Sequence, residues 1–264
     1  MTRDYRVETP AGALIVRRAE PGDAAALAAI AESTMGWLEA RGLDAGRPLM
    51  PLTEAIAARI AGDEVYLAQR GGVAAGTATL RWTPDALWGD ISGDALYLYG
   101  LMVRRDFAGQ QVGRYLLAWA THLAAARGTS ALRLDCDATN PALRAYYERI
   151  GFAYRGDVIF LDRRWARYER AIDAERLALP SGELVVTRAG AEDVAAAVAI
   201  EEDAASWVRS LGYHPGEPPR PLRDIFAEAV ARGQMYLARD DAEAVGKLAI
   251  TEADDLWTDR PGAA

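Results

Sequence analysis

Residues 95–152 constrain the fold more than any other part of this chain, because they combine strand, turn and helix signals in a fixed order. Apolar residues dominate the segment from Ala95 to Val103, which is typical of a buried strand. Gly109 and Gly113 then bracket a tight turn, and apolar residues recur at spacings of three and four through the helical segment that follows. A second strand and a second helix come next. The pattern predicts an α/β domain in which a helix begins directly after a buried strand.

A helix that starts at such a turn is suited to bind an anion. Its first backbone N–H groups have no intrahelical acceptor, and the helix dipole adds partial positive charge there. A pyrophosphate group would fit at the turn between Gly109 and Gly113. The glycines alone leave a second interpretation open, since many turns carry glycine only for a positive φ or for close packing.

The turn and the second helix together carry a more specific pattern. The turn is A-G-Q-Q-V-G over 108–113, and Asn140, Tyr147 and a Gly-Phe pair at 151–152 follow it. Over roughly residues 10–173 the chain resembles the GNAT superfamily of N-acetyltransferases, which use acetyl-CoA to acetylate an amine. The combination of both motifs is much more specific than either motif alone.

The resemblance implies an α/β (α+β) fold with a mixed, mostly antiparallel central sheet flanked by helices. The family turn has the pattern Gln/Arg-x-x-Gly-x-Gly/Ala. Ala108 stands where the family has Gln or Arg, and Gln111 stands where it has its first glycine. Arg104, Arg105 and Arg114 are candidates to supply additional positive charge near the phosphates.

The resemblance also implies which residues hold acetyl-CoA. The turn would bind the pyrophosphate, and the backbone at the end of the first strand would line the pantetheine arm and the acetyl carbonyl. The residues implied are Leu101, Met102, Val103, Ala108, Gly109, Gln110, Gln111, Val112, Gly113, Arg114, Asn140 and Tyr147. For Asn140, capping of the following helix is an equally good interpretation.

Acetyl transfer to an amine needs a neutral nitrogen, a polarised thioester carbonyl and a proton for the leaving thiolate. Tyr147 stands where the family places the phenol that assists the thiolate. Family members often carry His or Glu on the strand where this chain has Tyr97 and Tyr99, which makes both candidates for a catalytic role. A phenol is a poor base at neutral pH, so the proton would pass through water to a carboxylate, or the amine would arrive partly neutral. The carboxylates considered are Asp94, Asp90 and Glu39.

An internal repeat organises the rest of the chain. The sequence P-A-G-A-L-I-V-R-R-A from Pro10 returns as P-S-G-E-L-V-V-T-R-A from Pro180, at an offset of 170 residues. The offset holds without a gap to Gly76 and Gly246. Such self-similarity over a long stretch predicts a duplication. In the first copy we expect a helix from about residue 23 with Asp23 as its N-cap, and the helix after the glycine turn should run over 111–126.

The second copy ends early and has no counterpart of the glycine turn, Asn140 or Tyr147. We therefore expect a catalytic domain over 1–175 and a partial repeat with a structural or dimerisation role over 176–264. Half of a sheet leaves an open strand edge and an uncovered apolar face. The repeat should therefore dock on the catalytic domain or on a second subunit, the latter giving a homodimer.

The repeat also narrows the set of candidate catalytic residues. Only the first copy can bind acetyl-CoA, so we do not expect a residue that both copies share to be catalytic. Trp88 and Asp90 recur near the C-terminus as Trp257 and Asp259, so we expect structural roles for them. Acidic residues of the first copy that have no acidic counterpart are candidates for binding a cationic amine. These residues are Glu39, opposite Arg209, and Asp44, opposite His214.

Composition excludes several other classes of protein. A formal net charge of −8 argues against nucleic-acid binding, which needs a basic face. The single cysteine, Cys136, lies in an apolar strand, so we expect a buried structural thiol in a reducing compartment. The N-terminal sequence lacks the apolar core of a signal peptide, and no apolar run reaches spanning length. A cytoplasmic protein without membrane contact is expected.

These observations predict an enzyme that transfers an acetyl group from acetyl-CoA to a primary amine by direct attack, without a covalent enzyme intermediate. The acceptor would be a small molecule or a peptide, and no metal is expected. The alternative is a degenerate acyl-CoA-binding regulatory module without turnover, which the departures at Ala108 and Gln111 favour.

Overall fold

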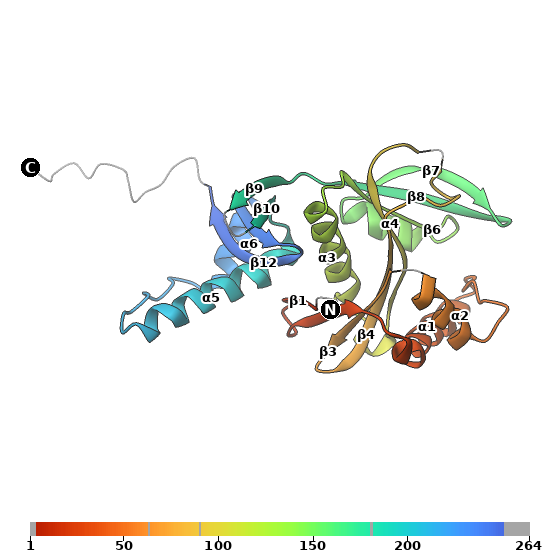
Figure 1. Ribbon diagram of the computed structural model, residues 1–264, viewed down its shortest axis with the longest axis horizontal. Coiled ribbons are helices and arrows are strands. Elements are labelled where there is room, and N and C mark those ends of the chain that lie inside the picture. The colour runs from red at the N-terminus through yellow and green to blue at the C-terminus, as the bar shows by residue number, and fades with distance from the viewer. Residues whose placement is uncertain (1–3, 63, 90, 180–181, 251–264) are drawn as a thin grey trace, which may run out of the picture.

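The computed structural model describes residues 4–62, 64–89, 91–179 and 182–250. Its larger sheet has eight strands in the order β1-β2-β3-β4-β5-β6-β8-β7 (Figure 1). The strands are β1 (Tyr5–Val7), β2 (Leu14–Arg18), β3 (Glu64–Arg70), β4 (Val73–Arg81), β5 (Ala95–Val103), β6 (Ala131–Asp137), β7 (Ala153–Phe160) and β8 (Arg163–Ala171). Neighbouring strands are antiparallel except β5 and β6, which are parallel. A parallel pair needs a crossover, and α3 (Val112–Ala126) supplies it.

Helices cover both faces of this sheet. The helices α1 (Ala24–Glu39) and α2 (Leu52–Gly62) pack on one face, while α3 and α4 (Pro141–Arg149) pack on the other. Alternation along β3 explains the two layers: Val65 and Leu67 join the cluster of α1 and α2, whereas Tyr66 and Ala68 join the cluster of α3. The expected GNAT-like mixed sheet flanked by helices is therefore present.

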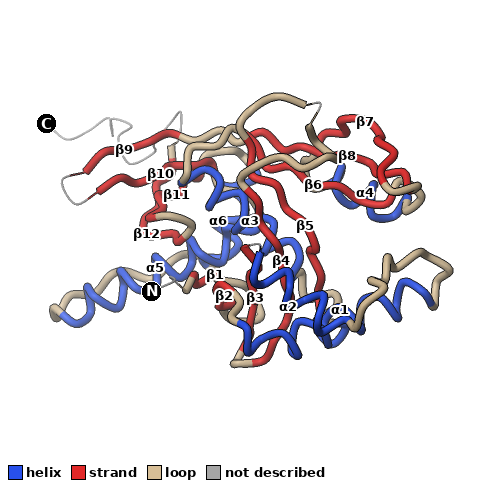
Figure 2. Tube along the Cα trace, turned by 45° about the vertical axis from the view of Figure 1, so that its right-hand side comes forward, coloured by secondary structure: helices blue, strands red, loops and turns tan. Residues whose placement is uncertain are grey.

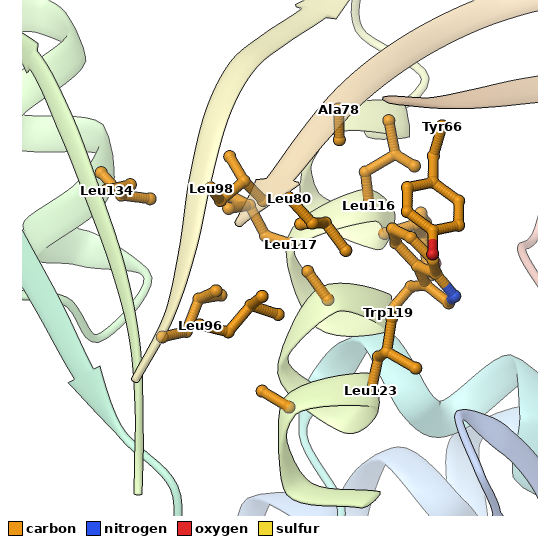
Figure 3. Close-up of a cluster of buried hydrophobic side chains, with 14 of the residues drawn as sticks. Tyr66, Ala78, Leu80, Leu96, Leu98, Leu116, Leu117, Trp119, Leu123 and Leu134 are labelled. Carbon is orange, nitrogen blue, oxygen red and sulfur yellow. The ribbon is translucent and has the colours of Figure 1, made fainter. Parts of the chain in front are cut away.

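The main core lies between α3 and the middle of the sheet (Figure 3). Trp119 of α3 is 1% exposed, and its ring lies 4.8 Å from that of Tyr66 and 5.6 Å from that of Tyr5. Leu116 and Leu123 flank it on the same helix. The 3.6-residue spacing that predicted an amphipathic helix thus corresponds to the buried side of α3.

The structure differs from the sequence-based expectation at the start of α1. We expected Asp23 to cap this helix, but its side chain makes no capping hydrogen bond to α1. Both carboxylate oxygens of Asp23 instead accept hydrogen bonds from Arg17, at 2.7 Å each, and one also accepts the Glu20 N–H at 2.8 Å. A charged partner on β2 outcompetes the local capping geometry.

A second, four-stranded antiparallel sheet follows, in the order β12-β11-β10-β9. Its elements are β9 (Glu175–Leu179), β10 (Gly182–Arg188), α5 (Val194–Ser210), α6 (Leu222–Ala231), β11 (Met235–Asp240) and β12 (Glu243–Ala249). A separate small core around Ala197, Phe226 and Leu237 holds them together. From β10 onward the elements have the same order as β2, α1, α2, β3 and β4.

The second sheet packs beside α3 of the same chain (Figures 1 and 2). Arg114 of α3 pairs with Glu192 at 3.1 Å, and the hydroxyl of Tyr5 donates to Asp241 at 3.1 Å. His122 of α3 lies 3.7 Å from Asp193, and burial together with Arg239 lowers the pKa of His122 well below its usual value. The imidazole is therefore neutral, so the contact is a packed polar one and not an ion pair. Among the described helices, none is long and apolar enough to cross a membrane.

The core between α3 and the sheet makes a stability prediction. Leu116 is 1% exposed, so Leu116→Ala should lower the free energy of unfolding by about 2–5 kcal/mol through lost burial and a residual cavity. Chemical denaturation followed by circular dichroism measures this change. Leu49→Ala is the control, because Leu49 is fully exposed and its replacement should change the value by less than about 0.5 kcal/mol. Equal effects of the two substitutions would contradict the assigned core.

Candidate active site

The strands β5 and β6 separate part-way along their length. They pair only from Ala95 with Ala131 to Leu98 with Leu134, although β5 continues to Val103 and β6 to Asp137. We call the unpaired ends, residues 99–103 and 135–137, the seam. Its cause lies on the other side of β5, where two residues, Gly100 and Leu101, oppose the single residue Ala78 of β4. Such a bulge bends its strand, and the φ of 56° at Gly100 suits glycine.

The start of α3 lies directly after β5 and is free of capping side chains. The helix N-cap is Gln111, which makes no side-chain cap, and the first helical hydrogen bond runs from Tyr115 N–H to the Gln111 carbonyl at 3.1 Å. The N–H groups of residues 112–114 therefore precede the helical ladder, as an anion site requires. Gln111 has a φ of 59°, which places a side chain at a position that favours glycine.

Four arginines surround this turn, but each one has a protein partner. Arg104 pairs with Asp106 at 3.1 Å, Arg105 lies over the ring of Trp37 at 4.3 Å, and Arg114 pairs with Glu192. Each of the three candidates for extra positive charge thus has a protein contact, while the buried Nε of Arg104 has no hydrogen-bond partner among the described residues. The fourth, Arg70 at the end of β3, donates to the side chain of Gln110 at 2.6 Å. No sequence motif indicates Arg70, because tertiary structure brings β3 to the turn.

Tyr147 of α4 lies among aromatic rings on the α3 side of the sheet. It is 6% exposed, and its ring lies 5.5 Å from that of Tyr146, 5.9 Å from Phe152 and 5.8 Å from Tyr168. Burial is the main cause that raises the pKa of Tyr147 above its usual value, and Cys136 and Asp135 of β6 act in the same direction. The phenol therefore stays protonated at neutral pH, next to the β6 side of the seam.

Asn140 caps α4. Its side-chain oxygen accepts the Leu143 N–H at 3.0 Å, and Pro141 occupies the first helical turn. The capping interpretation of Asn140 is confirmed. The contact between Asn140 and a pantetheine arm stays a prediction.

The two strand tyrosines have different surroundings. Tyr97 is 1% exposed and lies in the paired part of β5, where its hydroxyl accepts from Arg133 at 2.9 Å. Because this hydroxyl is engaged before the strands separate, the structure does not bring Tyr97 into the seam. Tyr99 is the first residue of the seam on β5. Its hydroxyl is buried with no hydrogen-bond partner in the described part of the chain, and burial, then Asp85, raises its pKa.

The acidic candidates are held by different arginines. Glu39 pairs with Arg47, which also pairs with Glu32 at 2.8 Å. Asp44 lies 3.4 Å from Arg163 of β8, and the same Arg163 reaches Asp137 of β6 at 2.9 Å. Asp44 is therefore linked to the seam through Arg163, whereas Glu39 belongs to an exposed network on α1. Of the other carboxylates considered, Asp94 is exposed and Asp90 lies outside the described residues.

Sequence reasoning missed Asp135, the first seam residue of β6. Its Oδ2 is buried without a hydrogen-bond partner among the described residues. Burial, and then the charge of Asp85, raises the pKa of Asp135 to about 7, while the Trp88 indole N–H acts in the opposite direction. A charged residue inside the apolar strand A-L-R-L-D-C was the signal that could have indicated it.

Cys136 follows on the opposite face and joins the core of α3. Burial is the main cause that raises the pKa of this thiol to about 12, so it is not activated. The expectation of a buried structural thiol is confirmed. Within the described residues, no three His, Cys, Asp or Glu side chains gather in a way that could hold a metal ion.

Comparison with known proteins identifies the family. The sequence model of the Acetyltransferase (GNAT) family matches residues 30–152. The uncharacterized N-acetyltransferase YesJ of Bacillus subtilis (strain 168) is 30% identical over 141 residues, which are 51% of this chain and 78% of YesJ. The chain belongs to the GNAT family of acetyltransferases.

Solved structures of GNAT proteins have the same fold. An acetyltransferase of the GNAT family from Listeria monocytogenes is 26% identical with a TM-score of 0.52, covering 63% of this chain and 99% of its own. One from Streptococcus agalactiae is 16% identical with a TM-score of 0.53, covering 61% and 96%. This chain is thus an acetyltransferase, which disfavours the alternative of a binding module without turnover.

The left-handed conformation at the turn can be tested directly. Gln111→Gly should raise the free energy of unfolding by about 1 kcal/mol, because glycine adopts a φ of 59° without a steric penalty. Thermal unfolding by calorimetry measures the change. Gln110→Gly is the matched control: its φ is negative, so glycine should bring no gain there. If both variants show the same change, the strain does not lie at Gln111.

Proposed function

We propose that this GNAT enzyme transfers an acetyl group from acetyl-CoA to a primary amine by direct attack of the amine nitrogen on the thioester. The observation that carries the proposal is the seam between β5 and β6, which opens directly beside the uncapped start of α3. A phosphate-bearing chain bound at the helix start can extend from there into the seam. The exposed backbone of residues 101–103 would then lie along it.

The chain's own residues fit acetyl-CoA at the turn. The N–H groups of residues 112–114, which precede the helical ladder, would receive the pyrophosphate, and they need no side chain to do so. The absent family side chain at Ala108 therefore costs a contact but leaves the backbone donors in place. A Cβ added at Gly109 would meet nothing within 4 Å, so the turn is open there. Bound acetyl-CoA would supply the activated acetyl group.

Tyr147 would assist the departing thiolate by donating its phenolic proton. Its raised pKa supports this role, since a phenol that stays protonated at neutral pH is a hydrogen-bond donor. Direct attack is supported by the state of Cys136, whose buried thiol is unsuited to form an acyl-enzyme. Tyr97 and Tyr99 are unsuited as bases, because a phenol has a high pKa even before burial.

We infer that residues 176–264 form a partial repeat of the catalytic domain over 1–175. Corresponding positions in the two parts support this inference. Asp23 binds Arg17, which also donates to Gln69 at 3.3 Å. At the positions 170 residues further on, Asp193 binds Arg239 at 2.7 Å, and Arg239 also donates to Thr187 at 2.6 Å.

The arginine has thus moved from the strand position of Arg17 to that of Gln69, while the carboxylate and the three-way contact persist. Both carboxylates also accept the N–H group three residues earlier, at 2.8 Å in each case. A repeated polar cluster with exchanged partners is readily explained by duplication. Since the second part packs on α3, we assign it a structural role.

The acceptor would be a small amine or a peptide amine, without nucleic acid or membrane as partner. The net charge of −8 supports the first exclusion. A single cysteine supports a reducing, cytoplasmic setting. A homodimer through the second sheet is supported by Val245 and Leu248 of β12, which are 50% and 43% exposed.

The role of Tyr147 gives a kinetic test. Tyr147→Phe should lower kcat by about 10-fold or more at an almost unchanged Kd for acetyl-CoA, because only the proton donor is lost. Thiol release followed with a chromogenic disulfide measures the rate, and calorimetric titration measures the affinity. Tyr154→Phe on β7 is the control, since Tyr154 is exposed and its hydroxyl donates to Asp157 at 2.7 Å, outside the seam. Equal rates for Tyr147→Phe and wild type would defeat the assignment.

The acidic candidates give a second test. A Glu39→Gln, Asp44→Asn double variant should raise KM for a cationic amine several-fold and leave kcat nearly unchanged, because charge at the entrance attracts the substrate. Rates measured at low and high salt should converge, since salt screens such attraction. Normal KM in the double variant would remove both residues from the substrate site.

A further inference from the structure

The face of the seam opposite α3 carries three buried polar groups that form no hydrogen bond of normal geometry among the described residues, although the Trp88 indole N–H lies near Asp135 and the Tyr99 hydroxyl lies near Asp85. They are the Oδ2 of Asp135, the hydroxyl of Tyr99 and the indole N–H of Trp88. Trp88 is fully buried, and its N–H lies close enough to Asp135 to lower the pKa of that carboxyl. Buried polar atoms without a partner are rare and costly in folded proteins. Three such groups that converge at one point indicate a place where a ligand completes the hydrogen bonds.

The alternation of β5 and β6 fixes which way these groups face. Leu98 and Leu134 point into the core of α3. Tyr99 and Asp135 are the next residues on each strand, so they point to the other face. They are also the first residues at which the two strands no longer pair. The carboxyl and the phenol therefore meet where the seam opens, on the side away from α3.

Asp135 differs from Asp137 on its own strand and from Asp157 on β7, two strands away, because it has no cationic partner among the described residues. Asp137 pairs with Arg163 at 2.9 Å, and Asp157 of β7 lies 3.7 Å from Arg164. Among the described residues, Asp135 takes part in no ion pair within 4.0 Å, and Asp85 adds a second negative charge nearby. A carboxylate that has no cationic side chain as partner is suited to bind a ligand that carries a positive charge.

The arginines around the site contact groups other than the Asp135 carboxyl. Arg81 lies over the ring of Tyr99 at 5.3 Å but reaches Asp85 at 3.8 Å. Arg167 on β8, opposite Asp135, donates to the backbone oxygen of Leu87 at 3.1 Å. The remaining cations are Arg59 of α2, whose guanidinium lies against Gly100, and Arg133, which binds Glu169. None of these arginines forms an ion pair with the Asp135 carboxyl among the described residues.

We propose that Asp135 binds the ammonium group of the acceptor amine at the seam and removes the proton that the nitrogen must lose before it attacks the thioester. This inference rests on the proposed function and names the base and the cation site within it. Tyr99 would accept or donate a hydrogen bond to the same nitrogen. The faces of Tyr99 and Trp88 suit a cation as well.

The protons balance over the whole reaction. Asp135 takes one proton from the ammonium group, and the freed electron pair forms the N–C bond to the acetyl carbon while the C–S bond breaks. Tyr147 gives its proton to the sulfur, and the second proton lost by the nitrogen restores the phenol through water. Asp135 then releases its proton to solvent, so that ammonium and acetyl-CoA give the amide, free CoA and one proton. A carboxyl with a pKa near the working pH is suited to this exchange.

Kinetics across pH test the proposal. With acetyl-CoA and a panel of primary amines that includes n-butylamine and 1,4-diaminobutane, Asp135→Asn should lose about 100-fold or more of kcat/KM at pH 7. The defect should shrink toward pH 10, where a much larger fraction of the amine is already neutral than at pH 7. The wild-type rate should fall as pH drops below about 7, and the variant should lack this limb. Asp157→Asn is the matched control, since Asp157 lies on β7, beyond β8 in the same sheet, and it should keep the wild-type profile.

Three outcomes of the kinetics would overturn the assignment. They are a normal rate for Asp135→Asn at pH 7, a defect of equal size at pH 7 and pH 10, and a wild-type limb retained in the variant. Asp135→Asn is expected to unfold at the same or a higher temperature than wild type at pH 8, because it removes a buried charge. A merely structural role of Asp135 would predict a pH-independent loss.

A binding experiment separates this proposal from the proposed function. Carbon-13 NMR of carboxyl-labelled enzyme should show one aspartate that titrates near pH 7 and is missing from Asp135→Asn. Adding n-butylammonium chloride should lower its midpoint, while potassium chloride at equal ionic strength should not. If no amine of the panel releases thiol from the wild type, the proposed function fails, and the NMR result alone decides the cation site. No effect of butylammonium in that case rejects the site.

Discussion

The separation of β5 from β6 after Leu98 and Leu134 is the constraint on which the rest of the site depends. Two strands that paired along their full length would bury the backbone groups that an extended ligand needs. The bulge at Gly100 and Leu101 bends β5 while β6 stays paired to β8 up to Asp137. One irregularity on one edge of a strand therefore frees backbone on the other edge, directly before the turn into α3.

The helix α3 links three parts of the molecule. Its buried side holds the core through Leu116 and Trp119, its first turn supplies free N–H groups, and its outer side carries the second sheet through Arg114 and His122. The pair between Arg114 and Glu192 joins the C-terminal part to the turn itself. An amphipathic helix at a protein surface leaves its polar side to water. Because the C-terminal part packs on that side of α3, it also determines how much of α3 is exposed.

Local sequence predicted most elements well, because they depend on periodicity. The expected helix over 111–126 is α3, and the expected strand over 95–103 is β5. The prediction failed where partners lie far along the chain. Asp23 was expected to cap a helix but binds Arg17, and Arg70 reaches the glycine turn from β3. The Asn140 cap was one of two open interpretations, and only the bond to Leu143 decided it.

The sequence by itself determined the family pattern, the glycine turn and the position of Tyr147, since each is a matter of residue order and spacing. Only the tertiary structure decided which acids and tyrosines meet. It engaged the hydroxyl of Tyr97 with Arg133 and gave Glu39 and Asp44 arginine partners. At the opening of the seam it buried the Oδ2 of Asp135 and the hydroxyl of Tyr99 without a hydrogen-bond partner of normal geometry among the described residues. The physical reason is that burial and the absence of a partner arise from contacts between strands, which no local pattern encodes.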